Sequence, residues 1–168
     1  MRLDPGSFTD SAAYSEDRLY RYRFERRWGR GDDGPFVVWV GLNPSTGDTD
    51  NGPRPTLRRM VSWSHEWGAS SLIVVNLFAW RSTDPKALKT VPDPVGPLNN
   101  DAILQAARSA SKVVVCWGGG GRLRGRGAAV AELLPGALCF GVTLSGHPRH
   151  PLFVPSGTEL RPFCARTR

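Results

Sequence analysis

Residues 36–42 constrain the fold most, because they form a nearly continuous apolar run that ends abruptly in a polar loop. Such a run is typical of a strand buried on both faces in the middle of a parallel sheet. Gly41 lets a ligand approach the backbone, and Pro44 keeps Asn43 extended and prevents direct continuation into a helix. Ligands of open α/β sheets bind at the carboxyl ends of strands, so we expect chemistry here. A simple turn is the alternative, because these residues also favour turns.

Three more apolar runs follow, each separated from the next by a helical pattern. The runs cover residues 71–77, 112–117 and 137–143, and the helical patterns cover residues 57–67, 98–110 and 127–134. This alternation predicts an α/β fold, a single three-layer α/β/α domain with a central four-stranded parallel sheet. We expect this domain to span residues 18–168. Residues 1–17 lack periodicity and are expected to form a flexible arm.

Residues 18–28 alternate aromatic and basic side chains, which predicts a strand. Such a strand could bind nucleic acid through phosphate contacts and stacking. The alternative is an edge strand whose charges prevent aggregation.

The net charge of +7 and the isoelectric point near 10.0 favour a polyanionic partner, either DNA or a nucleotide. The cysteines at 116, 139 and 164 are too few and too widely spaced for a zinc or iron–sulfur site. No stretch resembles a signal peptide or a membrane span. We therefore expect a cytoplasmic protein without metal, cofactor or membrane partner, and we take it to be a monomer.

Polar residues follow the second apolar run as they follow the first. Asn76 would lie beside Asn43 at one sheet edge, and an amide offers both a donor and an acceptor to a base edge. Phe78 could be a stacking surface or a core residue, and Arg81 continues the same loop. In the first loop, Asp48 could activate water or bind a metal, or it could simply be solvated.

Two later loops carry further candidates. Residues 118–121 are four glycines followed by Arg122 and Arg124, in a strand, loop and helix order that can bind phosphate. The loop lacks the features of a Walker A or dinucleotide motif. His147 and His150 follow the last apolar run, where a metal site or a proline-rich turn with incidental histidines are the alternatives.

Three short motifs together resemble the uracil-DNA glycosylase superfamily. They are Gly41-Leu-Asn43-Pro44, Val75-Asn76-Leu-Phe-Ala-Trp-Arg81 and His150-Pro151-Leu152. The resemblance implies a uracil-DNA glycosylase-like fold in which Asn43 positions the hydrolytic water and Asn76 reads the base. It also implies that the loop of His150 enters DNA and supports the leaving base. Ser45 stands where glycosylases carry Gly or Tyr.

A second resemblance covers most of the chain, from about Tyr20 onward. Leu-Asn-Pro-Ser-Thr, Asn-Leu-Phe-Ala, Trp-Gly and Gly-x-Pro-x-His-Pro-Leu are similar to a bacterial family known as a domain of unknown function, DUF1643. No activity is assigned to this family.

The glycosylase resemblance implies an N-glycosidase that hydrolyses the bond to a modified or deaminated base in DNA. The resemblance implies Asn43 and His150 as catalytic residues, and Asp48, in a loop that the resemblance does not cover, could assist them. The expected substrate-binding residues are Gly41, Leu42, Pro44, Ser45, Asn76, Phe78, Arg81, His147, Pro151 and Leu152. From the charge and the glycine loop, we expect Arg122 and Arg124 to bind nucleic acid. Two alternatives stay open: a hydrolase of a free nucleotide or nucleoside, and a nucleic-acid-binding module with an inactive pocket.

Overall fold

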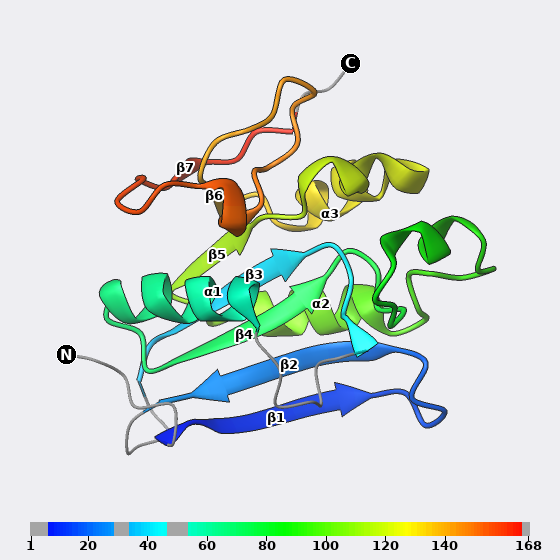
Figure 1. The fold of residues 1–168 in the computed structure, drawn as a ribbon, viewed down its shortest axis with the longest axis horizontal. Helices are drawn as coiled ribbons and strands as arrows, with labels where there is room; N and C mark the ends of the chain where they lie inside the picture. Colours follow the sequence, from blue (N-terminus) through cyan, green and yellow to red (C-terminus); the bar gives the residue numbers. More distant parts are fainter. Residues whose placement is uncertain (1–6, 29–33, 47–53, 166–168) are drawn as a thin grey trace.

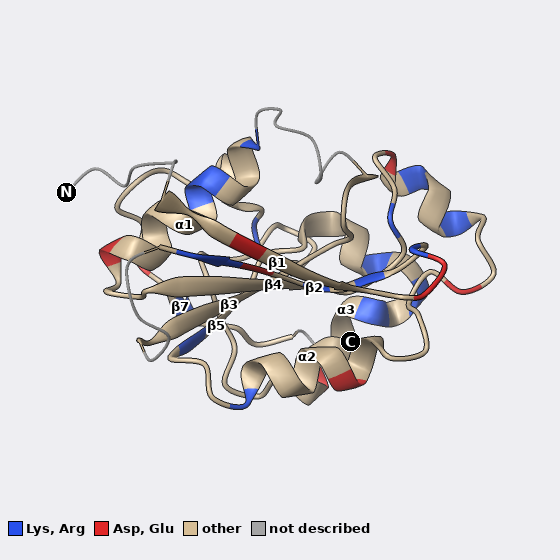
Figure 2. Ribbon diagram, turned by 90° about the horizontal axis from the view of Figure 1, so that it is seen from below, with Lys and Arg blue, Asp and Glu red and all other residues tan. Residues whose placement is uncertain are grey.

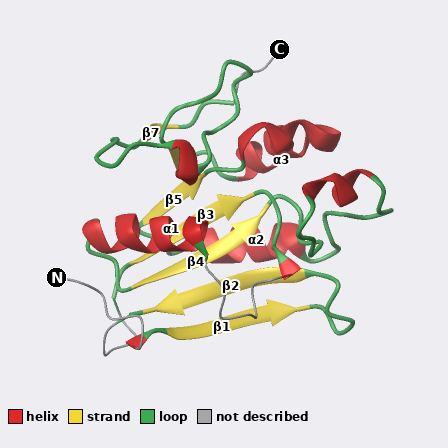
Figure 3. Cartoon of the chain, in the orientation of Figure 1, coloured by secondary structure: helices red, strands yellow, loops and turns green. Residues whose placement is uncertain are grey.

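The computed structural model describes residues 7–28, 34–46 and 54–165, and in these ranges seven strands form one mixed sheet (Figure 1). The sheet order is β1-β2-β4-β3-β5-β6-β7. The strands are β1 Thr9–Tyr14, β2 Arg21–Arg27, β3 Phe36–Gly41, β4 Ser71–Asn76, β5 Lys112–Val115, β6 Leu138–Cys139 and β7 Arg161–Pro162. The α-helices are α1 Pro55–Glu66, α2 Asn99–Ala107 and α3 Arg126–Leu133, and the 3₁₀-helices include η3 Pro85–Lys89, η4 Gly118–Gly125 and η5 Pro151–Phe153 (Figure 3).

The prediction of a single α/β sheet is confirmed, but the sheet is larger than the four parallel strands expected. The expected strands β4, β3, β5 and β6 do pair in parallel at its centre. Antiparallel strands β1 and β2 extend one side, and β7 extends the other. The edge-strand interpretation of residues 18–28 is wrong, because β1 pairs with β2 and places it inside the sheet. The sequence Thr-Asp-Ser-Ala-Ala-Tyr of β1 has too little hydrophobic patterning to predict that pairing.

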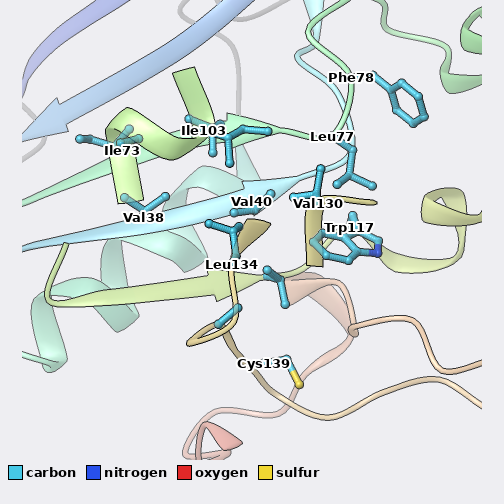
Figure 4. Packing of buried hydrophobic residues seen from close by; sticks show 14 of the residues in the cluster. Val38, Val40, Ile73, Leu77, Phe78, Ile103, Trp117, Val130, Leu134 and Cys139 are labelled. Carbon is cyan, nitrogen blue, oxygen red and sulfur yellow. The ribbon is translucent and has the colours of Figure 1, made fainter. Parts of the chain in front are cut away.

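The buried strands of the sheet place alternate side chains on opposite faces. On β3, Val38 and Val40 belong to the core that includes Ile103 of α2 and Val130 of α3 (Figure 4). Trp39, on the other face, packs with residues of α1. Figure 2 shows α1 and α2 on opposite sides of the strands. The fold is therefore three-layered around its central strands.

Two helix starts fix the geometry around the carboxyl ends of the strands. Helix α1 begins at Pro55, which suits the first helical position because proline has no N–H to leave unpaired. Helix α2 begins at Asn99, whose buried side chain does not cap its own helix. Its Nδ2 instead donates to the carbonyl oxygens of Asn76 and Leu77, at 2.9 and 3.0 Å. This pair of hydrogen bonds ties α2 to the end of β4.

The cysteines are free thiols, with Cys116 and Cys139 buried and Cys164 exposed. Burial raises the pKa of Cys116 to about 12, so its thiol stays protonated at neutral pH. Within the described ranges, no group of three or more His, Cys, Asp or Glu residues is placed to hold a metal ion. No helix in those ranges has both the length and the apolar character needed to cross a membrane.

Candidate active site

A pocket of about 540 Å³ lies at the carboxyl ends of the central strands. The chain leaves β3 towards β4 on one side and leaves β5 towards β6 on the other, so the strand order reverses between β3 and β5. Ligands of open α/β sheets bind at such switch points. Six residues predicted from the sequence line this pocket: Gly41, Leu42, Asn43, Ser45, Asn76 and His150.

Asn43 has an orientation fixed by two backbone acceptors. Its Nδ2 donates to the carbonyl oxygen of Ser82 at 2.9 Å and to that of Pro44 at 3.1 Å. Both partners only accept, so the nitrogen must occupy this side of the amide. In the described part of the chain, the Oδ1 atom accepts no hydrogen bond. Asn43 can therefore offer this oxygen to a water molecule in the pocket.

Asn76 lies directly beside Gly41 in the parallel pairing of β4 with β3. A Cβ atom at position 41 would come within 2.8 Å of the Asn76 Oδ1 atom, so the glycine makes room for this amide. Asn76 is only 5% exposed, and its side chain makes no hydrogen bond within the described residues. The Asn76 amide is not one of the fully buried side-chain groups that lack a partner, so it is accessible from the pocket, and water or a ligand can bind it there.

His150 presents a defined tautomer to the pocket. Its Nδ1 accepts a hydrogen bond from the backbone N–H of Leu152 at 3.3 Å. Burial lowers the pKa of His150 below its ordinary value of 6.5, so the ring is neutral at pH 7. The single ring proton is therefore on Nε2. His150 can donate a hydrogen bond from this atom.

Two predicted substrate-binding residues of the Asn76 loop lie elsewhere. Phe78 is fully buried and belongs to the core cluster shown in Figure 4, so it offers no stacking surface in this structure. Arg81 donates to the carbonyl oxygen of Arg18 at 2.9 Å, and its guanidinium lies 5.0 Å from the ring centroid of Tyr14. Neither residue lines the pocket.

The remaining predicted residues that the structure describes do not line the pocket. Pro44 and Pro151 are buried, and the carbonyl oxygen of Pro44 accepts from the backbone N–H of Ser82. Leu152 is 43% exposed, and His147 lies against Gly121 of η4. Burial, with Arg122 nearby, lowers the pKa of His147. Asp48 lies outside the described residues.

Two glycines of η4, Gly120 and Gly121, are explained by packing. A Cβ atom at Gly120 would meet the side chain of Leu42 at 2.7 Å, and one at Gly121 would meet Trp117 Nε1 at 2.4 Å. Arg122 is exposed, and Arg124 donates to the carbonyl oxygens of residues 91 and 92. No residue of η4 lines the pocket. The glycine loop thus supports Leu42 and Trp117, which themselves line it.

Gly121→Ala is expected to lower the free energy of unfolding by ~1–3 kcal/mol, because the added methyl group overlaps the indole of Trp117. Urea denaturation measures this loss. Gly119→Ala is the matched control, since its Cβ atom would meet nothing within 4 Å. Equal stability of the two variants would contradict the packing role of Gly121.

Several pocket residues were not singled out from the sequence, although Arg21 and Phe24 fall within residues 18–28, whose pattern suggested nucleic-acid contacts. Arg21 and Phe24 of β2, Arg54 before α1, and Trp117 after β5 all line the pocket. Arg21 lies at the pocket because β2 pairs antiparallel with β4. The backbone N–H of Arg21 donates to the carbonyl oxygen of Ala79, just after β4, at 2.9 Å. Arg21 is only 6% exposed. A buried arginine within an Arg-rich strand has no local signature, so only the strand pairing could identify it.

Comparison with known proteins identifies a family but no characterised relative. No curated protein and no solved structure matches the chain. The family model described as a protein of unknown function (DUF1643) matches residues 21–152. The matched range runs from Arg21 to the loop of His150 and includes the carboxyl ends of the three central strands. The chain therefore belongs to the DUF1643 family.

Proposed function

We propose that this protein is an N-glycosidase of the uracil-DNA glycosylase type, acting on a modified or deaminated base in DNA. One observation carries the proposal: Asn43, Asn76 and His150, from three separate segments, line the same pocket. Each has a polar atom suited to one part of base excision. The three short motifs that resemble the glycosylase superfamily contribute these same residues.

The reaction needs an oriented water on one side of the sugar and support for the departing base on the other. In the proposed mechanism, Asn43 Oδ1 accepts from the water, whose oxygen bonds to the anomeric carbon as the carbon–nitrogen bond breaks. The base leaves with the bonding electron pair, and His150 Nε2–H stabilises the negative charge that develops on it. The proton lost by the water goes to solvent. Asn76 reads the base edge.

The direct test is release of free base from single-stranded and duplex oligonucleotides that carry uracil, hypoxanthine or alkylated bases. Free nucleotides with the same bases are assayed beside them. Release from an oligonucleotide supports the proposal. If none of these substrates yields a free base while oligonucleotides still bind specifically, the protein is a binding module and the glycosidase proposal is wrong.

Asn76→Asp is expected to change the preference among bases by ~1–3 kcal/mol, because the substitution replaces an amide donor with an acceptor. Competition binding with oligonucleotides that differ in one base measures this change. Asn100→Asp serves as the control, because Asn100 is exposed and its Oδ1 acts as an acceptor for Arg126. Unchanged base preference in Asn76→Asp would show that Asn76 does not read the base.

The second candidate, a hydrolase of free nucleotides, is favoured by a specific observation. Arg21 and Arg54 line the pocket together with Asn76. Positive groups that share a pocket with a base-reading amide suit a ligand that brings its own phosphate.

A further inference from the structure

The two edges of the sheet are built differently (Figure 1). Strand β7, at one edge, has only the two residues Arg161 and Pro162, and short length, charge and proline all discourage another strand from pairing. Strand β1, at the other edge, has six residues with the sequence Thr-Asp-Ser-Ala-Ala-Tyr, and none of them is proline or basic. Among the described residues, β1 pairs only with β2. The β1 edge therefore lacks the protection that β7 has.

The hydrogen-bond pattern shows which backbone groups of β1 face outward. The backbone N–H of Trp28, just after β2, donates to the carbonyl oxygen of Ser70, just before β4. Bonding directions alternate along an antiparallel pair, so over residues 23–28 the even-numbered residues bond towards β4 and the odd-numbered residues towards β1. The β1 partners of these odd-numbered residues are Thr9, Ser11 and Ala13. The N–H and C=O groups of Asp10 and Ala12 therefore point away from β2.

The side chains of β1 leave room for a close neighbour. All residues of β1 except Tyr14 are exposed, and those in its middle are small. Asp10 is the one charged residue of the strand, and its two carboxylate oxygens accept from the Arg26 guanidinium at 2.7 Å each. The register shift of β1 falls between Ala13 and Tyr14, so the pairing is regular up to Ala13. The strand thus presents a regular edge whose single charge is already paired.

We propose that β1 binds a second copy of this chain, by antiparallel pairing of the two β1 edges about a two-fold axis at Ser11 or Ala12. Both copies present the same outward-facing groups, so the edge is complementary to itself, as a two-fold interface requires. With the axis at Ser11, Asp10 lies opposite Ala12 of the partner subunit, and with the axis at Ala12 it lies opposite Tyr14 of the partner subunit. In neither arrangement do like charges face each other, which would be destabilising. The two sheets then continue into one, and the protein is a dimer rather than the monomer expected from the sequence.

The first experiment is Ala12→Pro, because proline removes the outward N–H of this residue and leaves the bonds from β1 to β2 in place. Sedimentation equilibrium from about 1 μM to about 1 mM covers the Kd range of a small interface. The wild-type protein should form dimers, and Ala12→Pro should raise the dimer Kd about tenfold or more. Ala12→Val is the matched control, since it keeps the N–H and should form dimers like wild type. A wild-type protein that stays monomeric overturns the proposal and leaves the edge to an extended segment of another protein.

The second experiment locates the axis by cysteine cross-linking and needs no proline in the strand. Every variant also carries Cys164→Ser, because Cys164 is exposed whereas the other two cysteines are buried. A residue on the axis lies opposite its own copy with Cα atoms about 4.5–5.5 Å apart, which is within disulfide range. Ser11→Cys or Ala12→Cys should therefore form a disulfide-linked dimer under mild oxidation, and Ala128→Cys, exposed on α3, should not. Failure of both β1 variants to cross-link beyond Ala128→Cys, or an Ala12→Pro variant that dimerises like wild type, overturns the proposal.

Discussion

Replacing His150 by Ala is expected to slow base release about 10²–10³-fold, the usual loss when one preorganised donor to a developing negative charge is removed. The neutral ring holds its proton on Nε2, because Nδ1 accepts from the backbone N–H of Leu152 and burial lowers the pKa. Single-turnover measurement of free base, at saturating enzyme, separates this loss from any change in binding.

Two further variants sharpen this experiment. His150→Gln keeps an N–H donor on a side chain of similar length and should recover part of the lost rate. His65→Ala removes another half-buried histidine that lies on α1 outside the pocket, and it should release base at the wild-type rate. Base release by His150→Ala at the wild-type rate would remove His150 from the mechanism.

Trp39→Ala is expected to lower the free energy of unfolding by ~3–5 kcal/mol, because it removes a large, fully buried side chain and leaves a cavity. Trp39 is surrounded by Trp63, Trp67 and Phe140, with ring centroids 5.7 to 6.2 Å away. Its Nε1 donates to the buried hydroxyl of Ser64 at 2.9 Å, which joins β3 to α1. Urea denaturation followed by circular dichroism measures the change.

The control for this prediction is Leu144→Ala, because Leu144 is fully exposed and its truncation should change stability by less than about 0.5 kcal/mol. The loss of unfolding free energy in Trp39→Phe should lie between those of Trp39→Ala and Leu144→Ala. Phenylalanine keeps most of the aromatic volume but leaves the Ser64 hydroxyl without its donor. A loss in Trp39→Ala as small as that in Leu144→Ala would contradict the central packing of this residue.

Local hydrophobic patterns were enough to predict the centre of the fold. The apolar runs of β3, β4 and β5 are each continuous over several residues, and α1 shows a clear helical spacing. Parallel strands leave their carboxyl ends at one edge, which is why Asn43 and Asn76 could be expected together. The pocket lined by both residues agrees with that expectation.

Only the tertiary structure shows the outer strands of the sheet and the position of Arg21 at the pocket. Strand β1 has no apolar pattern, so its pairing with β2 depends on backbone hydrogen bonds that the sequence does not signal. That pairing, with β4 on the other side, carries Arg21 to the pocket. Phe78 lies in the core, and Gly120 packs against Leu42, because residues distant in the sequence surround them. Local patterns predict which face of an element is buried, whereas contacts between distant elements determine which polar residues share a site.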